Sequence, residues 1–249
     1  MTSPTLLRLW LTAATLLLGG ALLAASANEA QIRRALAERL PSLPPIDEVT
    51  RTPMPGLWEV RIGTDVLYTD ERGDFIVQGS LIDTRTRTNL TEQRIARLTA
   101  IDFAALPLRD AMVVRQGNGA RRIAVFGDPN CGFCRRFERD LMALRDVTIY
   151  MFLYPILGAD STEKSRAIWC ARDPMQAWRG LMIDGTAPPR VLGRCDDGAL
   201  ARNVELGRRH RIGGTPAMVF EDGTRRQGAI DAAELERLLA AHSRPQPRR

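Results

Sequence analysis

The four cysteines are the residues of this chain best suited to chemistry, and they form two unlike pairs. Cys131 and Cys134 are separated by two residues in a C-x-x-C motif. A thiolate in such a motif can attack a disulfide, and its neighbour can then resolve the mixed disulfide. Cys170 and Cys195 lie far from the motif and from each other. The spacing therefore predicts one redox pair and leaves the second pair either bridged or free.

A zinc site and a purely structural disulfide are the alternatives for the C-x-x-C motif. Structural zinc sites usually have a second close pair of cysteines or histidines. The only histidines are His210 and His242, and they stand far apart. A disulfide that closed so short a loop would constrain little of the unfolded chain. Redox chemistry is therefore favoured, and we expect no metal.

The residues around the motif predict a strand, a turn and a helix in that order. Ile123–Phe126 is a short apolar run, and Gly-Asp-Pro-Asn at 127–130 breaks it. Three later apolar residues repeat at helical spacing: Phe137, Leu141 and Leu144. Cys131 should then lie in the first turn of a helix, where free N–H groups and the helix dipole stabilise a thiolate. Cys134 should be more buried.

Two polar residues are candidates for proton transfer. Asp128 precedes Cys131 by three residues, and His210 precedes Pro216 by six. Aspartate is common in turns and at helix caps, and His210 stands among arginines in a predicted helix. A structural role for Asp128 and an exposed position for His210 are therefore the simpler interpretations.

A second set of elements follows residue 213. Thr215 and Pro216 precede an apolar strand at Ala217–Phe220, and residues 221–224 form a turn toward a hairpin partner. Asp231 and Glu234 have the spacing of a capping box for a last helix. A cis bond before Pro216 would turn the preceding backbone outward, although an ordinary loop proline is the simpler alternative.

Taken together, these elements resemble the thioredoxin fold. Three stretches are similar to the DsbC family of periplasmic disulfide isomerases: residues 126–134, Ile168-Trp169-Cys170 and residues 214–217. The similarity covers the chain beyond its first 27 residues. Phe133 stands between the cysteines where the best-known members have tyrosine.

The resemblance implies a role for each candidate residue. Cys131 would attack a substrate disulfide, and Cys134 would resolve the intermediate. Thr215 and cis-Pro216 would bind an extended substrate. Cys170 and Cys195 would form a structural disulfide, which would stabilise the fold by about 3 kcal/mol. No flavin, nicotinamide or metal motif occurs, so we expect no cofactor. The resemblance names a membrane electron carrier of the DsbD type as the reductant.

Residues 1–27 have the pattern of a secretory signal peptide. Arg8 precedes an apolar run, Leu9–Ala25, and Ala25-Ser-Ala27 provides small residues for cleavage. An uncleaved anchor is the alternative, but the run is short for a spanning helix. We expect cleavage after Ala27 and export to the periplasm, where disulfides persist.

The hydrophobic pattern of residues 28–90 predicts a small α+β unit. A helix ends near residue 40, and short strands follow at 58–62, 66–68, 75–77 and 81–82. The resemblance makes this unit a dimerisation domain, and a monomeric cap is the alternative. Asn89 and Glu92 resemble a capping box that opens a linker helix over 91–110.

Residues 111–249 form the predicted thioredoxin-like catalytic domain. Glycines at 117 and 119 predict a hairpin between strands at 113–114 and 123–126. A buried strand should follow at 148–153. Helix starts near Asp160, Asp173 and Asp196 predict a helical insertion over about 160–209.

The composition is that of a globular protein with a basic balance. The 249 residues are 45% hydrophobic and carry a net charge of +6, yet no long basic run occurs, so we expect no nucleic-acid partner. Lys164 is the only lysine. The function expected is a homodimeric isomerase and reductase of misoxidised periplasmic proteins. The alternatives are a thiol oxidase, a DsbG-like reductant of sulfenic acids, and a chaperone without redox turnover.

Overall fold

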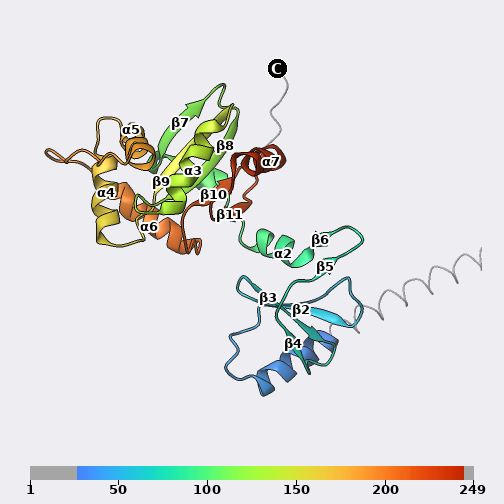
Figure 1. The fold of residues 1–249 in the computed structure, drawn as a ribbon. Coiled ribbons are helices and arrows are strands. Elements are labelled where there is room, and N and C mark those ends of the chain that lie inside the picture. The colour runs from blue at the N-terminus through green and yellow to red at the C-terminus, as the bar shows by residue number, and fades with distance from the viewer. Residues whose placement is uncertain (1–26, 244–249) are drawn as a thin grey trace, which may run out of the picture. The chain divides into compact units, whose positions relative to one another are not determined.

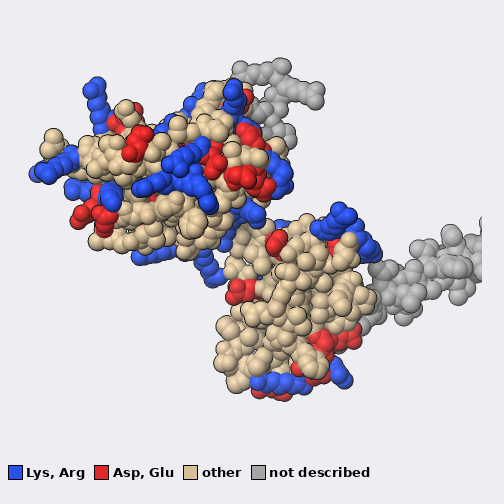
Figure 2. All heavy atoms as spheres, in the orientation of Figure 1, with Lys and Arg blue, Asp and Glu red and all other residues tan. Residues whose placement is uncertain are grey.

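The computed structural model describes residues 27–243, which divide into two compact units between Leu98 and Thr99 (Figure 1). The expected signal peptide lies, except for its last residue, outside the described residues. Between residues 27 and 243, no helix is both long and apolar enough to span a bilayer. Figure 2 shows basic and acidic side chains interspersed among uncharged residues on the face drawn.

The first unit is one helix packed on a small antiparallel sheet. The helix covers residues 27–39, and the sheet has the order β1 (Glu48–Arg51), β2 (Leu57–Ile62), β3 (Asp65–Asp70) and β4 (Ile76–Val77). Alternate residues of β2 bury Trp58 and Val60 against Ile32 and Leu36 of the helix. Strands β5 (Ile82–Asp83) and β6 (Thr88–Asn89) form a separate two-stranded ladder.

Helix α2 (Leu90–Leu98) begins as predicted but ends early. The Asn89 side chain accepts a hydrogen bond from the Glu92 N–H at 3.0 Å, as a cap does. The helix expected over 91–110 is wrong beyond Leu98. Ile101 and Phe103 instead enter the core of the second unit, and Asp102 caps a 3-10 turn at Phe103–Ala105. A second such turn covers Leu108–Asp110.

A five-stranded sheet forms the centre of the second unit. Its order is β11 (Arg225–Gln227), β10 (Ala217–Phe220), β8 (Arg121–Gly127), β9 (Val147–Leu153) and β7 (Met112–Gln116). Strands β8 and β9 are parallel, and all other pairs are antiparallel. The parallel pair is joined by helix α3 (Gly132–Ala143), which begins within the C-x-x-C motif. The predicted hairpin of β10 and β11 is confirmed.

The hairpin predicted around residues 117–119 is wrong. Strand β7 pairs with β9 and not with β8, so β9 lies between them. Gly117 and Gly119 do turn the chain, with positive φ angles. The Asn118 N–H, however, donates to Asp146 just before β9. A local turn signal does not specify which strands pair, and the deeply buried β9 takes the place between β7 and β8.

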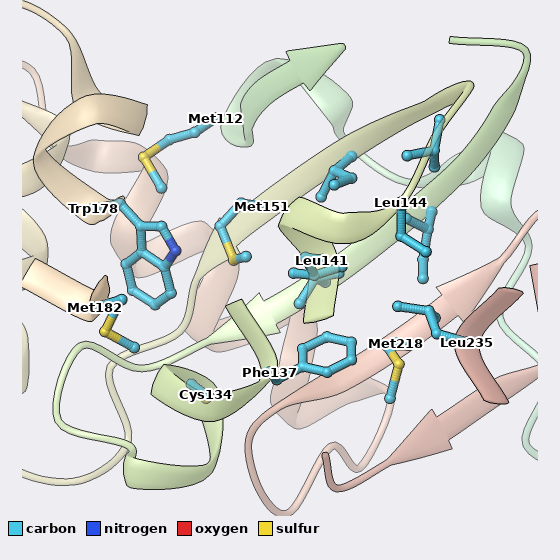
Figure 3. Packing of buried hydrophobic residues seen from close by; sticks show 14 of the residues in the cluster. Met112, Cys134, Phe137, Leu141, Leu144, Met151, Trp178, Met182, Met218 and Leu235 are labelled. Atoms are coloured by element: carbon cyan, nitrogen blue, oxygen red, sulfur yellow. The ribbon is translucent and has the colours of Figure 1, made fainter. Parts of the chain in front are cut away.

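Both faces of the large sheet are covered. Ile123 and Val125 of β8 face a cluster with Phe137 and Leu141 of α3, while Ala124 and Phe126 face the opposite side. Figure 3 shows the first cluster. It also contains Trp178, from the segment between β9 and β10, and Leu235 of helix α7 (Ala232–His242). The alternation has the period of a strand buried on both faces.

The segment between β9 and β10 is the predicted helical insertion. It contains α4 (Ala159–Trp169), α5 (Pro174–Arg179), a π-helical turn (Gly180–Asp184) and α6 (Gly198–Arg209). Asp173 caps α5, as its position in the sequence indicated. Asp160 lies in the first turn of α4, whose N-cap is Gly158.

Candidate active site

Cys131 lies at the N-terminal end of α3, directly after the turn that follows strand β8. It is the N-cap residue and so stands just before the first turn in which it was expected. The Cys134 N–H donates to Cys131 Sγ at 3.0 Å, as N-cap side chains accept from the third helical amide. Both cysteines are buried, Cys134 slightly more than Cys131.

The two thiols have opposite pKa shifts. A hydrogen bond from the Cys134 thiol lowers the pKa of Cys131 to about 6, and the backbone amides of Cys134 and Phe133 act in the same direction. Burial raises the pKa of the Cys134 thiol. At neutral pH, Cys131 is therefore chiefly a thiolate and Cys134 a neutral thiol. This is the asymmetry that an attacking and a resolving cysteine need.

Thr215 and Pro216 reach the same place from a distant part of the chain. The peptide bond between them is cis. In its thiol form Cys131 donates to the Thr215 carbonyl oxygen at 3.3 Å. Strand β10 pairs Ala217 with Phe126 of β8, so the segment before β10 lies next to the turn after β8. The structure thus brings together Cys131, Cys134, Thr215 and Pro216.

The buried Asp128 carboxylate holds neighbouring loop and helix segments through hydrogen bonds, and none of these bonds is to a cysteine. One carboxylate oxygen accepts from the Asn130 N–H (2.8 Å) and the Ser161 hydroxyl (2.7 Å). The other accepts from the N–H groups of Ile156 and Leu157, at 2.8 and 3.0 Å. These four donors occupy the acceptor positions of the carboxylate, so the turn role was the better interpretation.

His210 caps the C-terminal end of α6. Burial lowers the pKa of its imidazole, and Arg209 and Arg225 add to this effect. The ring is half-buried, so the expected exposed position is wrong. Within residues 27–243, no group of three or more His, Cys, Asp and Glu side chains could hold a metal ion.

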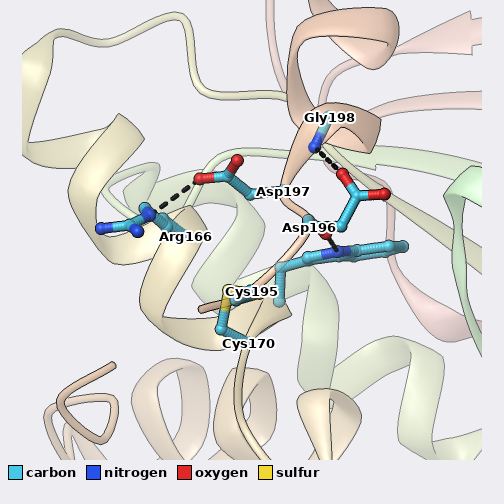
Figure 4. Close-up of a disulfide and its surroundings, with 7 residues drawn as sticks. Arg166, Cys170, Cys195, Asp196, Asp197 and Gly198 are labelled. Carbon is cyan, nitrogen blue, oxygen red and sulfur yellow. Dashed lines mark hydrogen bonds and ion pairs between the residues drawn. A yellow bond between two sulfur atoms is a disulfide. The ribbon is translucent and has the colours of Figure 1, made fainter. Parts of the chain in front are cut away.

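Cys170 and Cys195 form a disulfide at the edge of the insertion (Figure 4). Their Cα atoms are 5.9 Å apart. The bridge ties the end of α4 to the segment before α6. Trp169 Nε1 donates to the Asp196 carbonyl oxygen at 3.0 Å, and Arg166 pairs with Asp197 at 2.8 Å. Three contacts thus hold the same two segments together.

Sequence reasoning missed the polar contacts of Asn130, which directly precedes Cys131. Its side chain contacts Asp160, Ser161 and Lys164 of α4. The one available signal was the single lysine in an arginine-rich chain. Its partner lies 34 residues away, which no local pattern reveals.

Two protein families match this chain in the expected order. A family described as the disulfide bond isomerase protein N-terminal domain matches residues 23–92, and a thioredoxin-like domain family matches residues 108–243. These matches confirm the expected fold class, a small N-terminal α+β domain followed by a thioredoxin-like domain with a helical insertion.

The names of two curated relatives and of one solved structure all refer to disulfide interchange. The probable thiol:disulfide interchange protein DsbC of Bordetella pertussis is 45% identical over 194 residues, which are 78% of this chain and 68% of that protein. The DsbC of Escherichia coli K12 is 28% identical over 88% of this chain and 91% of its own. The crystal structure of a disulfide interchange protein from Neisseria gonorrhoeae has a TM-score of 0.52 and 34% identity, and covers 56% of this chain and 100% of that one.

The matched regions include both cysteine pairs and the cis-proline segment. A low-pKa cysteine beside a buried one at a helix N-terminus is the site that thiol:disulfide exchange requires. The chain is a thiol:disulfide oxidoreductase, and it belongs to the DsbC family of thiol:disulfide interchange proteins.

Proposed function

We propose that this protein rearranges and reduces wrong disulfides in exported proteins, with Cys131 as nucleophile and Cys134 as resolving thiol. The observation that carries the proposal is the position of Cys131. Its sulfur accepts from the Cys134 N–H and has a pKa of about 6. A sulfur that is ionised near neutral pH attacks disulfides at the pH of the compartment.

The exchange begins when the Cys131 thiolate attacks one sulfur of a substrate disulfide. A new S–S bond forms to Cys131, the substrate S–S bond breaks, and the second substrate sulfur leaves as a thiolate. If another substrate thiolate attacks the mixed disulfide, Cys131 is released unchanged, and no net electrons move. That route is isomerisation.

The second route uses Cys134. Its thiol loses a proton and attacks Cys131 Sγ, which releases the substrate sulfur as a thiolate that takes up a proton. The substrate gains two electrons and the enzyme is left with a Cys131–Cys134 disulfide. Another dithiol must then reduce this bond, and we infer a DsbD-type membrane reductase as its source.

The surface around Cys131 suits an extended, partly apolar substrate. Phe133 is 63% exposed and Leu157 is 54% exposed, and both belong to segments of the Cys131 site. We infer that Thr215 and Pro216 bind the substrate chain beside the sulfur, Thr215 through its backbone and Pro216 through its ring. The Pro216 carbonyl oxygen accepts from the Gly228 N–H, whereas the Thr215 carbonyl oxygen faces Cys131.

We further infer a homodimer formed by the first unit, which ends at Leu98. Strand β4 is an edge of the four-stranded sheet. Phe75 and Val77 at this edge are 71% and 52% exposed. An apolar edge strand is a template for pairing across a two-fold axis. The signal peptide and a periplasmic location complete the proposal, with misoxidised proteins and no nucleic acid as partners.

The test is reactivation of a scrambled multi-disulfide protein by the reduced chain from residue 28 onward. Wild type should restore activity, Cys131→Ala should not, and Cys134→Ala should retain isomerisation but lose net reduction. A wild type that does not reactivate, despite a reactive Cys131, would favour an oxidase or a sulfenic-acid reductant. Equal suppression of aggregation by wild type and Cys131→Ala, without reactivation, would favour a chaperone.

A further inference from the structure

A polar bridge joins the turn that carries Cys131 to helix α4 of the insertion. Asn130, the residue before Cys131, is at its centre. The Asn130 amide nitrogen donates to Asp160 Oδ2 at 2.7 Å and to Ser161 Oγ at 3.0 Å. The amide oxygen accepts from Lys164 Nζ at 2.8 Å. Lys164 also pairs with Asp160, four residues earlier on α4, at 2.7 Å.

A buried layer lies beneath this bridge. Ser161 and Asp128 have no exposed surface, and the serine hydroxyl donates to the Asp128 carboxylate at 2.7 Å. Ser161 belongs to both layers, because it also accepts from Asn130. Helix α4 therefore holds Asp128 and Asn130, two of the three residues between β8 and Cys131.

The chemistry of Lys164 determines how the Asn130 amide is oriented. An ammonium group only donates and a carboxylate only accepts. Lys164 therefore faces the amide oxygen and Asp160 faces the amide nitrogen, so the flipped orientation would lose both contacts. Asn130 and Cys131 together set where the sulfur lies relative to the Cys134 N–H, because Cys131 is the cap of α3.

The use of lysine here is itself informative. The chain has 35 Lys and Arg residues, and Lys164 is the only lysine among them. A planar guanidinium and a compact ammonium are not interchangeable donors. The described contacts bring two other charged groups to Asn130: the Asp160 carboxylate at its amide nitrogen and the Asp128 carboxylate at its backbone N–H. Arg136 of α3 instead lies over the Phe133 ring at 5.6 Å.

We propose that Lys164 is a positioning residue for disulfide exchange, which fixes the Asn130 amide and through it the turn that presents Cys131. The proposal rests on the proposed role of Cys131 as the nucleophile. Lys164 does not act on the substrate itself. It keeps Cys131 in the geometry in which the thiolate is stabilised.

The test is the rate at which iodoacetamide alkylates Cys131 in the reduced chain from residue 28 onward, measured across pH. Lys164→Met removes the ammonium but keeps the apolar stem, and Lys164→Arg restores a cation. Glu163→Gln is the matched control, since Glu163 is an exposed neighbour on α4. Thermal unfolding of each variant confirms that it folds.

We expect the alkylation rate near pH 6 to fall about threefold in Lys164→Met, the effect of one half-exposed ion contact. The rate near pH 9, where the thiolate is formed in every variant, should be unchanged. Lys164→Arg should recover part of the loss, and Glu163→Gln should match wild type. A Lys164→Met profile equal to that of wild type at every pH would overturn the proposal.

A second variant shows whether Lys164 acts through Asn130. In an Asn130→Ala background, Lys164→Met should cause no further change. A further threefold fall would mean that the ammonium acts directly on the sulfur, and the positioning role would be wrong. A wild-type profile without an ionisation near pH 6 would instead count against the proposed role of Cys131, so the two failures are distinguishable.

Discussion

The two cysteines of the C-x-x-C motif are chemically alike and differ in their surroundings. Cys131 receives hydrogen bonds from the Cys134 thiol and from backbone amides at the helix end, which lower its pKa to about 6. Cys134 is enclosed by apolar side chains of the α3 cluster, and burial raises its pKa. The proposed order of attack and resolution rests on this difference, since only the thiolate is nucleophilic.

The ionisation of Cys131 should make the stability of the reduced protein depend on pH. Its pKa of about 6 in the folded state is below the value of about 8.5 for a free cysteine. The stability from this source is complete above the unfolded pKa and is lost as pH falls through the folded pKa.

The expected difference in unfolding free energy between reduced wild type and Cys131→Ser therefore grows from about pH 6 to about pH 8.5. Urea denaturation with a reductant present measures it. Cys134 stays protonated over this range and does not contribute. A difference that stays constant with pH would show that the Cys131 pKa is not lowered by folding.

Glu138 is a second buried ionisable group of helix α3. Its carboxylate accepts from Trp178 Nε1 at 2.8 Å and from Arg179 Nε at 3.1 Å. Burial raises its pKa, while these two contacts oppose the shift. Loss of Arg179 would leave a buried charge with one neutral donor.

We expect Arg179→Met to lower the unfolding free energy by about 2 kcal/mol near pH 7. The loss should be smaller near pH 5, because a protonated Glu138 needs no cation. Urea denaturation at the two pH values measures both. Arg237→Met is the control, since its pair with Glu234 is exposed and worth at most about 0.5 kcal/mol. Equal losses for the two variants would contradict the account.

The elements around the site were predictable because their signals are local. The apolar run before Gly127, the turn residues after it and the helical spacing after Cys134 place β8 and α3 correctly. The strand pairing of β7 was not predictable from its glycine turn, since β9 competes for the same edge. The end of α2 depends on Ile101 entering the distant core of the second unit.

The sulfur chemistry of the site was predictable from the sequence, but the hydrogen bonds that position the Cys131 turn were not. The motif and the Thr215-Pro216 pair identify the groups that converge on Cys131. The bridge from Asn130 to Lys164 joins residues from two elements, and polar residues carry no periodic signal that would reveal such a contact. The resemblance to a family was needed to pair Cys170 with Cys195.

The Cys170–Cys195 disulfide should stabilise the insertion without changing the reactive pair. The bridge spans 25 residues, so the Cys170→Ala, Cys195→Ala double variant should lose about 3 kcal/mol of unfolding free energy. Urea denaturation without reductant measures the loss. The alkylation of Cys131 near pH 6 should stay within about twofold of wild type, since the bridge lies at the far end of α4. A variant as stable as wild type would show that the other contacts suffice.

Dimerisation, as proposed, depends on the first unit and should be lost when its exposed edge is made polar. A Val77→Lys variant places a charge on β4, the strategy by which natural edge strands avoid pairing. Sedimentation should give the mass of two chains for wild type and of one chain for the variant. Met54→Lys is the control, because Met54 is an exposed apolar residue between β1 and β2. Dimers in both variants would place the interface elsewhere.

The role of Cys131 is tested most directly by trapping its mixed disulfide. A reduced Cys134→Ala variant lacks the resolving thiol, so mixing it with a scrambled substrate should accumulate a covalent complex. Peptide mass spectrometry then identifies the linked residue. The account predicts a substrate cysteine bonded to Cys131, formed faster at pH 7 than at pH 5. A complex linked through Cys170 or Cys195, or no complex at all, would contradict it.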